Sequence, residues 1–465
     1  MKLTLRFAAG MAIAGAIGLA ASEPHWSAAA PQQTPPATQP PPTQPQEVTT
    51  TIRIGGGGAP PRFAVPDFIA LSSDTETIAI GKTVAQVLWD DFTFEREFSM
   101  IPRDTYTTIP AATSLTDLPF DRWRELGADG VVIGTVQKTG SGVRVQVRLY
   151  EIAMRRSVFG QEYAGGAGSA RLYAHTIADE IHQQQRGLRG VARTKLAFDS
   201  DRSGERMSGT VENRGVKEIF ISDYDGENQR QVTTNRSLNI TATWSPDGRS
   251  IAYTSYRRGL PNIFISNIYQ GTMEEMTKNA ESNFLPAWSP DGTRVCFMSN
   301  RDGNPEIYVA NRDGSNVRRL TNHPANDVTC TWSPSGTEIA FTSDRTGSPQ
   351  IYVVGVDGLG LQKITSEPYC DRPTWSPAPY NEIAYSARTG PGQDIKVIDL
   401  TTRQVRQLTF GEGSNESPSW APNGRHVAFM STRAGRHQIF TIARDGKDVR
   451  QVTKLGNNYQ PDWSK

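Results

Sequence analysis

The sequence predicts two domains in one chain, an α+β N-terminal domain followed by a six-bladed β-propeller. The first observation is a repeat in the second half, where tryptophans recur every 43 to 45 residues. They are Trp244, Trp288, Trp332, Trp375, Trp420 and Trp463. The second is a turn of the Ser-Pro-Asp-Gly type, which follows most of them in full or variant form. The third is that residues 50–187 carry helical and strand patterns without this repeat. Four short strands per repeat are typical of propeller blades.

Each repeat resolves into strands joined by tight turns. In the second Trp unit the tryptophan strand is followed by apolar strands at 295–297 and 307–309, and Asp313-Gly314 leads to a last strand at 319–321. Proline presets its own φ and Asp-Gly accepts positive φ, which suits close chain reversals. β-Branched and aromatic residues at period two suit half-buried strands.

The repeat is out of phase with the ends of the propeller. The first unit, beginning at 196–198, lacks a tryptophan strand, whereas the chain ends on one at Trp463. We therefore expect the C-terminal strand to complete the first blade, which would remove the open edges of a linear array.

The N-terminus has the pattern of a secretory signal. Lys2 and Arg6 precede an apolar stretch at 7–21, which is short for a membrane span. We expect a signal peptide within residues 1–30, with a membrane anchor as the alternative. Residues 31–49 are rich in Pro and Gln and predict a flexible linker, with a docking motif as the alternative.

Residues 50–187 predict the α+β domain, and 188–465 the propeller. Helices are expected at 73–92, 120–126 and 170–185 from their apolar spacing. Strands are expected at 52–54 and 63–65, and a meander of strands at 131–133, 143–149 and 157–163.

Composition restricts the function further. The net charge of +1 and the lack of a basic run give no sign of a nucleic-acid partner. Three cysteines cannot all pair within one exported chain. Cys296 replaces alanine in a core strand and is expected to be a buried free thiol. A Cys330–Cys370 bridge is one alternative for the other two.

No pattern of catalytic or metal-binding residues stands out. The sequence has no nucleophile elbow, zinc-protease motif or phosphate-binding loop. The glycines at 55–58 are followed by Pro60 and Pro61, which favours a loop over a nucleotide site. The six histidines lack metal-ligand spacing, and the Asp-Gly pairs are better explained as turns than as calcium ligands. We expect no enzyme activity, no cofactor and no metal.

The junction at 190–198, Gly-Val-Ala-Arg-Thr-Lys-Leu-Ala-Phe, joins this α+β domain to the Trp-Ser-Pro-Asp-Gly blades. Together these features resemble the TolB family, the periplasmic propellers of the Tol-Pal cell-envelope system, over residues 50–465. The resemblance implies a periplasmic, non-enzymatic scaffold. It implies that the propeller binds the lipoprotein Pal, that the N-terminal segment engages TolA, and that Pal provides a peripheral link to the outer membrane. Other envelope lipoproteins are further candidate partners. The implied role is outer-membrane integrity and envelope constriction in cell division.

Two segments are the candidate partner sites. The loops before the Trp strands should ring the central channel, and their residues vary most between blades. The candidates for Pal are Leu238, Asn239, Thr241, Phe284, Leu285, Asp327, Asp371, Arg372, Glu416 and Tyr459. We expect exposed Phe284 and Leu285 to form an apolar anchor within a polar rim. The candidates for TolA are Ile52, Arg53 and Ile54, in a strand-like segment hinged by glycines. That segment could equally be the first strand of the domain's own sheet.

Two other functions remain open. One is a periplasmic propeller that binds a ligand or glycan outside the Tol system. The other is a relative of the propeller peptidases, but their hydrolase domain would need a further ~200 residues with a nucleophile elbow.

Overall fold

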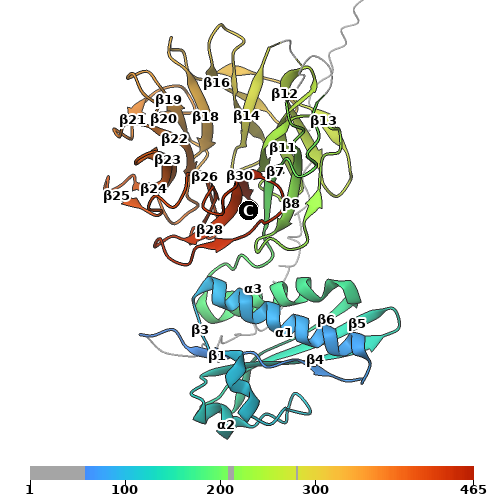
Figure 1. The fold of residues 1–465 in the computed structure, drawn as a ribbon. Helices are drawn as coiled ribbons and strands as arrows, with labels where there is room; N and C mark the ends of the chain where they lie inside the picture. Colours follow the sequence, from blue (N-terminus) through green and yellow to red (C-terminus); the bar gives the residue numbers. More distant parts are fainter. Residues whose placement is uncertain (1–57, 208–213, 279–280) are drawn as a thin grey trace, which may run out of the picture. The chain divides into compact units, whose positions relative to one another are not determined.

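The computed structural model describes residues 58–207, 214–278 and 281–465 (Figure 1). The predicted signal peptide at 1–30, the predicted linker at 31–49 and the strand predicted at 52–54 lie outside these residues. Within the described ranges, no helix has the length and apolar character needed to cross a membrane.

The N-terminal domain contains one sheet with strand order β3-β1-β4-β5-β6, and β2 pairs with β4. Its strands are β1 (Arg62–Ala64), β2 (Ile69–Ala70), β3 (Ser99–Met100), β4 (Gly130–Thr139), β5 (Gly142–Glu151) and β6 (Arg156–Gly166). Its helices are α1 (Thr75–Glu95), α2 (Phe120–Glu125) and α3 (Ala170–Arg186), with short 3-10 helices at Arg103–Thr108 and Ala167–Ser169. The predicted helices and the antiparallel β4-β5-β6 meander are confirmed. The two-residue strands β2 and β3, and the parallel pairing of β1, were not predicted.

The sheet is covered on both faces. Along β5 the side chains alternate, with Val143, Val145 and Val147 buried and Arg144 exposed, as the period of a strand requires. The valines join the core formed by α1 and α3. A second core around Trp123 of α2 covers the opposite face near Val131 and Ile133. Figure 1 shows α1 and α3 on one side of the sheet and α2 on the other.

The propeller has six four-stranded blades, as predicted. Blade 1 contains β30 (Asn458–Trp463), β7 (Lys195–Ser200), β8 (Glu218–Asp223) and β9 (Arg230–Gln231). Blade 2 contains β10 (Asn239–Trp244), β11 (Ser250–Arg258), β12 (Leu260–Asn267) and β13 (Met273–Glu275). Blade 3 contains β14 (Asn283–Trp288), β15 (Arg294–Ser299), β16 (Glu306–Asn311) and β17 (Arg318–Arg319). Blade 4 contains β18 (Asp327–Trp332), β19 (Glu338–Ser343), β20 (Gln350–Gly355) and β21 (Gln362–Lys363). Blade 5 contains β22 (Cys370–Trp375), β23 (Glu382–Arg388), β24 (Gln393–Asp399) and β25 (Val405–Gln407). Blade 6 contains β26 (Asn415–Trp420), β27 (His426–Ser431), β28 (Gln438–Ala443) and β29 (Arg450–Gln451).

The C-terminal strand closes the ring as the phase of the repeat predicted. β30 pairs antiparallel with β7, placing Trp463 opposite Leu196 and Asn458 opposite Ser200. Blade 1 therefore joins the two ends of the propeller, and its innermost strand comes from the last residues of the chain.

The repeated tryptophans hold neighbouring blades together. All six side chains are buried, at 3–8% exposure. In three blades the indole Nε1–H donates to a backbone carbonyl of the preceding blade, as Trp288 does to Thr243 at 3.3 Å and Trp332 to Ala287 at 3.1 Å. Trp420 donates likewise to Thr374 at 3.2 Å. Each of these three tryptophans thus contributes apolar burial and a bond across the blade boundary.

The threonine that ends each repeat closes the outer edge of its blade. Its hydroxyl accepts the N–H of the isoleucine that begins the apolar part of the third strand, at 2.8–3.0 Å in every blade. The six threonines are Thr233, Thr277, Thr321, Thr365, Thr409 and Thr453. Because the fourth strand is only two or three residues long, a side chain supplies the bond that the backbone lacks.

The expectation that Cys296 is a free thiol was wrong, and the alternative Cys330–Cys370 bridge does not form. Cys296 and Cys330 form a disulfide with a Cα–Cα distance of 6.3 Å, and Cys370 is a buried free thiol. Cys330 lies two residues before its tryptophan and Cys370 lies five before, so the two sit about 10 Å apart along their strands. Cys296 on β15 instead faces β18 of the next blade, and the disulfide joins blades 3 and 4.

The N-terminal domain contacts the propeller through the ends of α1 and α3. Arg425, which follows the first turn of blade 6, reaches Glu95 at 2.7 Å and Glu97 at 2.9 Å. Arg96 pairs with Asp445 at 3.0 Å, in the turn between β28 and β29.

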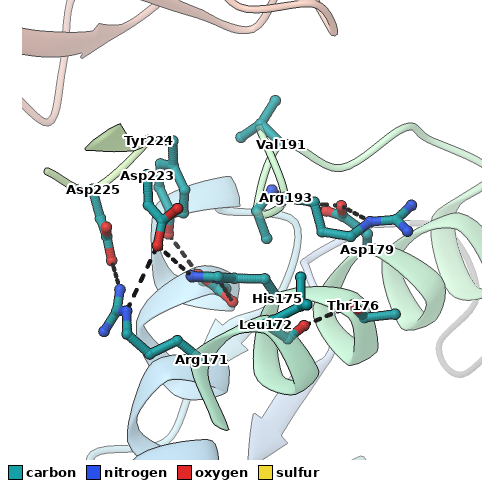
Figure 2. Close-up of polar contacts among 12 residues, drawn as sticks. Arg171, Leu172, His175, Thr176, Asp179, Val191, Arg193, Asp223, Tyr224 and Asp225 are labelled. Carbon is teal, nitrogen blue, oxygen red and sulfur yellow. Dashed lines mark hydrogen bonds and ion pairs between the residues drawn. The ribbon is translucent and has the colours of Figure 1, made fainter. Parts of the chain in front are cut away.

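A second group of contacts forms at blade 1. Figure 2 shows Arg171 and His175 of α3 directed toward Asp223 and Asp225. Tyr224 donates to the buried carboxylate of Asp91 at 2.7 Å, and His175 lies 2.9 Å from the same carboxylate. Burial raises the pKa of Asp91 against the opposing effect of these two partners.

Candidate partner-binding site

The strand order gives the propeller two distinct faces. The turns after the tryptophans and the turns between third and fourth strands lie on one face. Arg425, Asp225 and Asp445 belong to these turns and contact the N-terminal domain, so we call this the domain face. The opposite face carries the starts of the innermost strands, and we call it the rim face.

The predicted Pal-binding residues lie on strands rather than in loops. Apart from Leu238, which directly precedes β10, all of them belong to the innermost strands. Phe284 and Leu285 are half-buried, so the expectation that they are exposed was wrong. Asn239 and Asp327 are fully buried. The strands begin earlier than predicted because each continues through a bulge before the tryptophan.

Counting back from each tryptophan sorts the site into three rings. The support ring lies five residues before it and contains Asn239, Asn283, Asp327, Cys370, Asn415 and Asn458. The mouth ring lies four before it and contains Ile240, Phe284, Val328, Asp371, Glu416 and Tyr459. The bulge ring lies three before it and contains Thr241, Leu285, Thr329, Arg372, Ser417 and Gln460.

Arginines anchor the support ring in four blades. Arg202, Arg301, Arg345 and Arg433 each donate to the support-ring residue of their own blade at 2.7–3.0 Å. Each also bonds the serine two residues before it, at 2.9–3.1 Å. Their guanidinium groups stack over two aromatic rings of the blade at 4.0–5.7 Å. The starts of these innermost strands are therefore fixed by charge-assisted bonds and stacking.

Blades 3 and 4 offer a matched test of this anchor. Arg345 bonds the buried carboxylate of Asp327 at 2.7 Å, whereas Arg301 bonds the neutral amide of Asn283 at 3.0 Å. Arg345→Met should cost about 3 kcal/mol because it leaves a buried charge unpaired. Arg301→Met should cost about 1–2 kcal/mol. Urea unfolding of both variants measures the difference, and equal losses would contradict a role for the Asp327 charge.

The bulge ring has a conformation unusual for its residues. All six members have φ between 47° and 57°, in the left-handed region, although none is glycine. In blades 2, 3 and 6 the bulge turns the backbone N–H toward the preceding blade, where Thr241 bonds Gln460 at 3.1 Å, Leu285 bonds Thr254 at 3.2 Å and Ser417 bonds Ser386 at 3.0 Å. In these three blades, backbone strain of about 1 kcal/mol or more per residue is thus offset by bonds between blades.

The bulge ring lines a central channel of about 460 Å³. The mouth ring divides in two around it. Blades 2, 3 and 4 contribute Ile240, Phe284 and Val328, all half-buried. Blades 5 and 6 contribute the carboxylates of Asp371 and Glu416, and blade 1 contributes Tyr459. The rim face therefore presents an apolar half beside an acidic half.

Tyr459 lies in a charged setting. The Lys217 Nζ is 3.2 Å from the centre of its ring and pairs with the buried carboxylate of Asp199 at 2.9 Å. Burial and the nearby charges of Asp201 and Asp199 raise the pKa of Tyr459 to about 12. Its hydroxyl donates to a carboxylate oxygen of Asp201 at 3.4 Å.

The prediction missed several residues of this face. Ile240 and Val328 belong to the mouth ring, and aligning the repeats on tryptophan would have found them. Phe410 and Leu455 are 73% and 68% exposed in the loops before β26 and β30. The other repeats are mostly polar at the Phe410 position, so the apolar exception was visible in the sequence.

The structure says less about the predicted TolA residues and about metal binding. The candidate TolA residues Ile52, Arg53 and Ile54 lie outside the described part of the chain. Among residues 58–207, 214–278 and 281–465, no group of three His, Cys, Asp or Glu side chains is placed to hold a metal ion.

Comparisons with known proteins agree with both domains. Residues 183–465 match the family described as "TolB beta propeller domain", and residues 50–158 match "TolB amino-terminal domain". The chain is 34% identical to the Tol-Pal system protein TolB of Desulfosudis oleivorans over 42% of each chain. It is 37% identical to that of Geobacter sulfurreducens over 37% of each. The aligned parts thus span about two fifths of these relatives.

A solved structure covers more of the chain. The crystal structure of TolB from Acinetobacter baumannii superposes with a TM-score of 0.73 at 25% identity, over 88% of this chain and 98% of that one.

Proposed function

This chain belongs to the TolB family, and on that premise we propose that it is a non-enzymatic scaffold of the Tol-Pal system in the periplasm. Its channel mouth on the rim face binds the lipoprotein Pal, which provides a peripheral link to the outer membrane. The segment before residue 58 engages TolA. Through these two contacts the protein supports outer-membrane integrity and constriction during cell division.

The half-apolar, half-acidic mouth ring is the observation that carries this proposal. Protein interfaces combine a packed apolar centre with a polar margin. Ile240, Phe284 and Val328 supply the apolar part, and Asp371 and Glu416 supply acceptors for basic groups of the partner. The arginine anchors fix the strands of four of the six blades, so in these blades little order has to be gained on binding. The rim face is also opposite the face that the N-terminal domain contacts.

The disulfide supports the proposed compartment. Cys296 and Cys330 are joined between blades, and disulfides persist in oxidising surroundings such as the periplasm. The signal pattern at the N-terminus points the same way.

Two variants test the two contacts against each other. Phe284→Ala should weaken Pal binding about 30-fold, the loss of a central aromatic anchor, and leave TolA binding unchanged. Deleting 47–58 should abolish TolA binding and leave Pal binding within a few-fold. Calorimetric titration with purified Pal and TolA measures both. Leu359→Ala is the control, because Leu359 is 71% exposed on the domain face.

The opposite outcomes are distinct. Unchanged Pal affinity in both Phe284→Ala and Asp371→Ala would show that the mouth ring is the wrong surface. Unfolding of the N-terminal domain on deletion of 47–58 would make that segment structural. Retention of glycans from an envelope extract, without Pal, would favour a glycan-binding propeller instead.

A further inference from the structure

Trp244, at the boundary between blades 1 and 2, differs from the equivalent tryptophans of the other blades. Trp288, Trp332 and Trp420 each donate the indole N–H to the preceding blade, whereas the Nε1 of Trp244 has no hydrogen-bond partner among the described residues. Trp244 is 4% exposed. An unpaired polar group at this depth is costly, and so the position favours a ligand that accepts a hydrogen bond.

Trp244 lines an open cleft between the N-terminal domain and the domain face of blades 1 and 2. The cleft has a volume of about 790 Å³. Its walls come from α3 and β6, from the connection between α3 and β7, and from two turns of blade 2. Tyr269, in one of these turns, is 73% exposed and offers an apolar surface at the entrance.

The carboxylates of the cleft are already bonded. Asp179 accepts the N–H of Ala192 at 2.9 Å and pairs with Arg193 at 3.1 Å (Figure 2). Glu180 accepts the hydroxyl of Tyr163 at 2.6 Å. Asp247 accepts the backbone N–H of Arg249 at 3.0 Å, within its own turn. None of these acids needs a further partner.

By contrast, two cationic side chains of the cleft lack an ion-pair partner among the described residues. The guanidinium of Arg189 and the Nζ of Lys465 form no ion pair with any described residue, while Lys195 pairs with Asp223. Asp462, in the channel wall next to the cleft, is the one acid that acts on Lys465 electrostatically, and its carboxylate accepts the backbone N–H of Trp244 at 2.8 Å. The cleft thus has two cations without an ion-pair partner and one indole N–H without an acceptor among the described residues.

We propose that this cleft binds a carboxylate group, held by the Trp244 indole N–H together with Arg189 and Lys465. Charge-assisted bonds from two cations and one buried N–H suit the two oxygens of a carboxylate. The exposed Tyr269 and the cleft volume of about 790 Å³ fit a carboxylate on an extended peptide. The site is on the domain face and does not depend on the rim-face contacts proposed above.

The indole resonances of protein labelled with ¹⁵N at tryptophan test the proposal, with Trp244 assigned through Trp244→Phe. The probe is a capped peptide of small residues with one central Glu. Its addition should shift the Trp244 signal saturably and leave the Trp288 signal in place. Arg189→Gln and Lys465→Gln should each weaken binding about tenfold, as expected for loss of a charge-assisted bond. Arg436→Gln, on the rim face, is the control.

The outcomes decide between ligands. A Glu-to-Gln peptide that shifts the signal equally, or a signal that does not move, would overturn the proposal, as would a response to inorganic phosphate alone. Glutarate giving the full shift would support the carboxylate site and assign it to small dicarboxylates. Trp244→Phe keeps most of the buried apolar volume and loses no hydrogen bond, so it should fold with a melting temperature within a few degrees of the parent, and its loss of binding can be interpreted.

Discussion

Deleting residues 458–465 should open the propeller and remove its cooperative unfolding transition. The deletion takes away β30, so that β7 loses its inner neighbour and blades 1, 2 and 6 lose a shared wall. Trp463 is 3% exposed, and its Nε1–H donates to Thr194 at 2.7 Å. Burial of this tryptophan alone contributes about 3–5 kcal/mol. The backbone bonds of the strand add to it.

Graded variants separate closure from local packing. Trp463→Phe keeps the strand and most of the apolar volume, and should lower the melting temperature by only a few degrees. Trp463→Ala should lower it by roughly 10 °C. Lys465→Ala leaves the strand intact and serves as the control. Calorimetry measures all four proteins, and a truncated chain that melts like the parent would contradict closure by β30.

The number of blades could be predicted because each repeat places the same residues at the same inter-blade position. Trp288 and Trp332 make equivalent contacts with the preceding blade. The spacing between tryptophans is therefore enough to predict the number of blades in the ring. The helices of the N-terminal domain were predictable for a related reason. Their apolar residues recur at the period of the helix, as Val84 and Leu88 show in α1.

The parts that were missed depend on contacts between distant residues. The two-residue strand β3 has no periodicity, and it exists because Ser99 and Met100 pair with β1. The disulfide depends on which strands face each other across a blade boundary, and spacing to the tryptophans does not reveal that. The bulge that redirects Leu285 cannot be seen in the sequence, because leucine rarely has positive φ.

The candidate residues were predicted to lie in the loops before the tryptophan strands, whereas all of them except Leu238 lie on these strands, at depths that the sequence did not indicate. Asn239 and Phe284 were placed together at the channel, yet Asn239 is fully buried and Phe284 is half-buried. The difference lies in one step along the strand, since neighbouring residues point to opposite sides. Register of this kind follows from the pairing with the next strand and from the bulge.

Acid should weaken the contact between the N-terminal domain and the propeller. His182 of α3 and His426 of β27 are both buried there, at 1% and 4% exposure. Burial, together with the charge of Arg425, lowers the pKa of each to about 3. A histidine whose pKa is lowered on folding stabilises the folded state above its unfolded pKa of about 6.5. That contribution is lost as the pH falls below 6.5.

The neighbouring groups set the size of the effect. Arg425 lies 3.3 Å from the Nε2 of His182, and the Nε2 of His426 lies 3.2 Å from the Phe94 carbonyl oxygen. Arg186, Arg96 and Arg450 add positive charge that disfavours protonation. Between pH 6.5 and 4.5 each histidine should cost about 2–3 kcal/mol of unfolding free energy. Glu95 has the opposite effect on the pH dependence of stability. Burial raises the pKa of Glu95 to about 8, so lowering the pH protonates this carboxylate and removes a buried charge.

The double variant His182→Gln, His426→Gln isolates the histidines from Glu95 and from the other carboxylates. Glutamine can donate to the Phe94 carbonyl and accept from Arg425, and it does not titrate. Urea unfolding at pH 7.5 and 4.5 should therefore show a smaller loss of stability in the variant than in the parent, by several kcal/mol. His323→Gln, in a rim-face loop, should behave as the parent. Equal losses in parent and double variant would mean that these histidines are already exposed, and that the domains separate before the propeller unfolds.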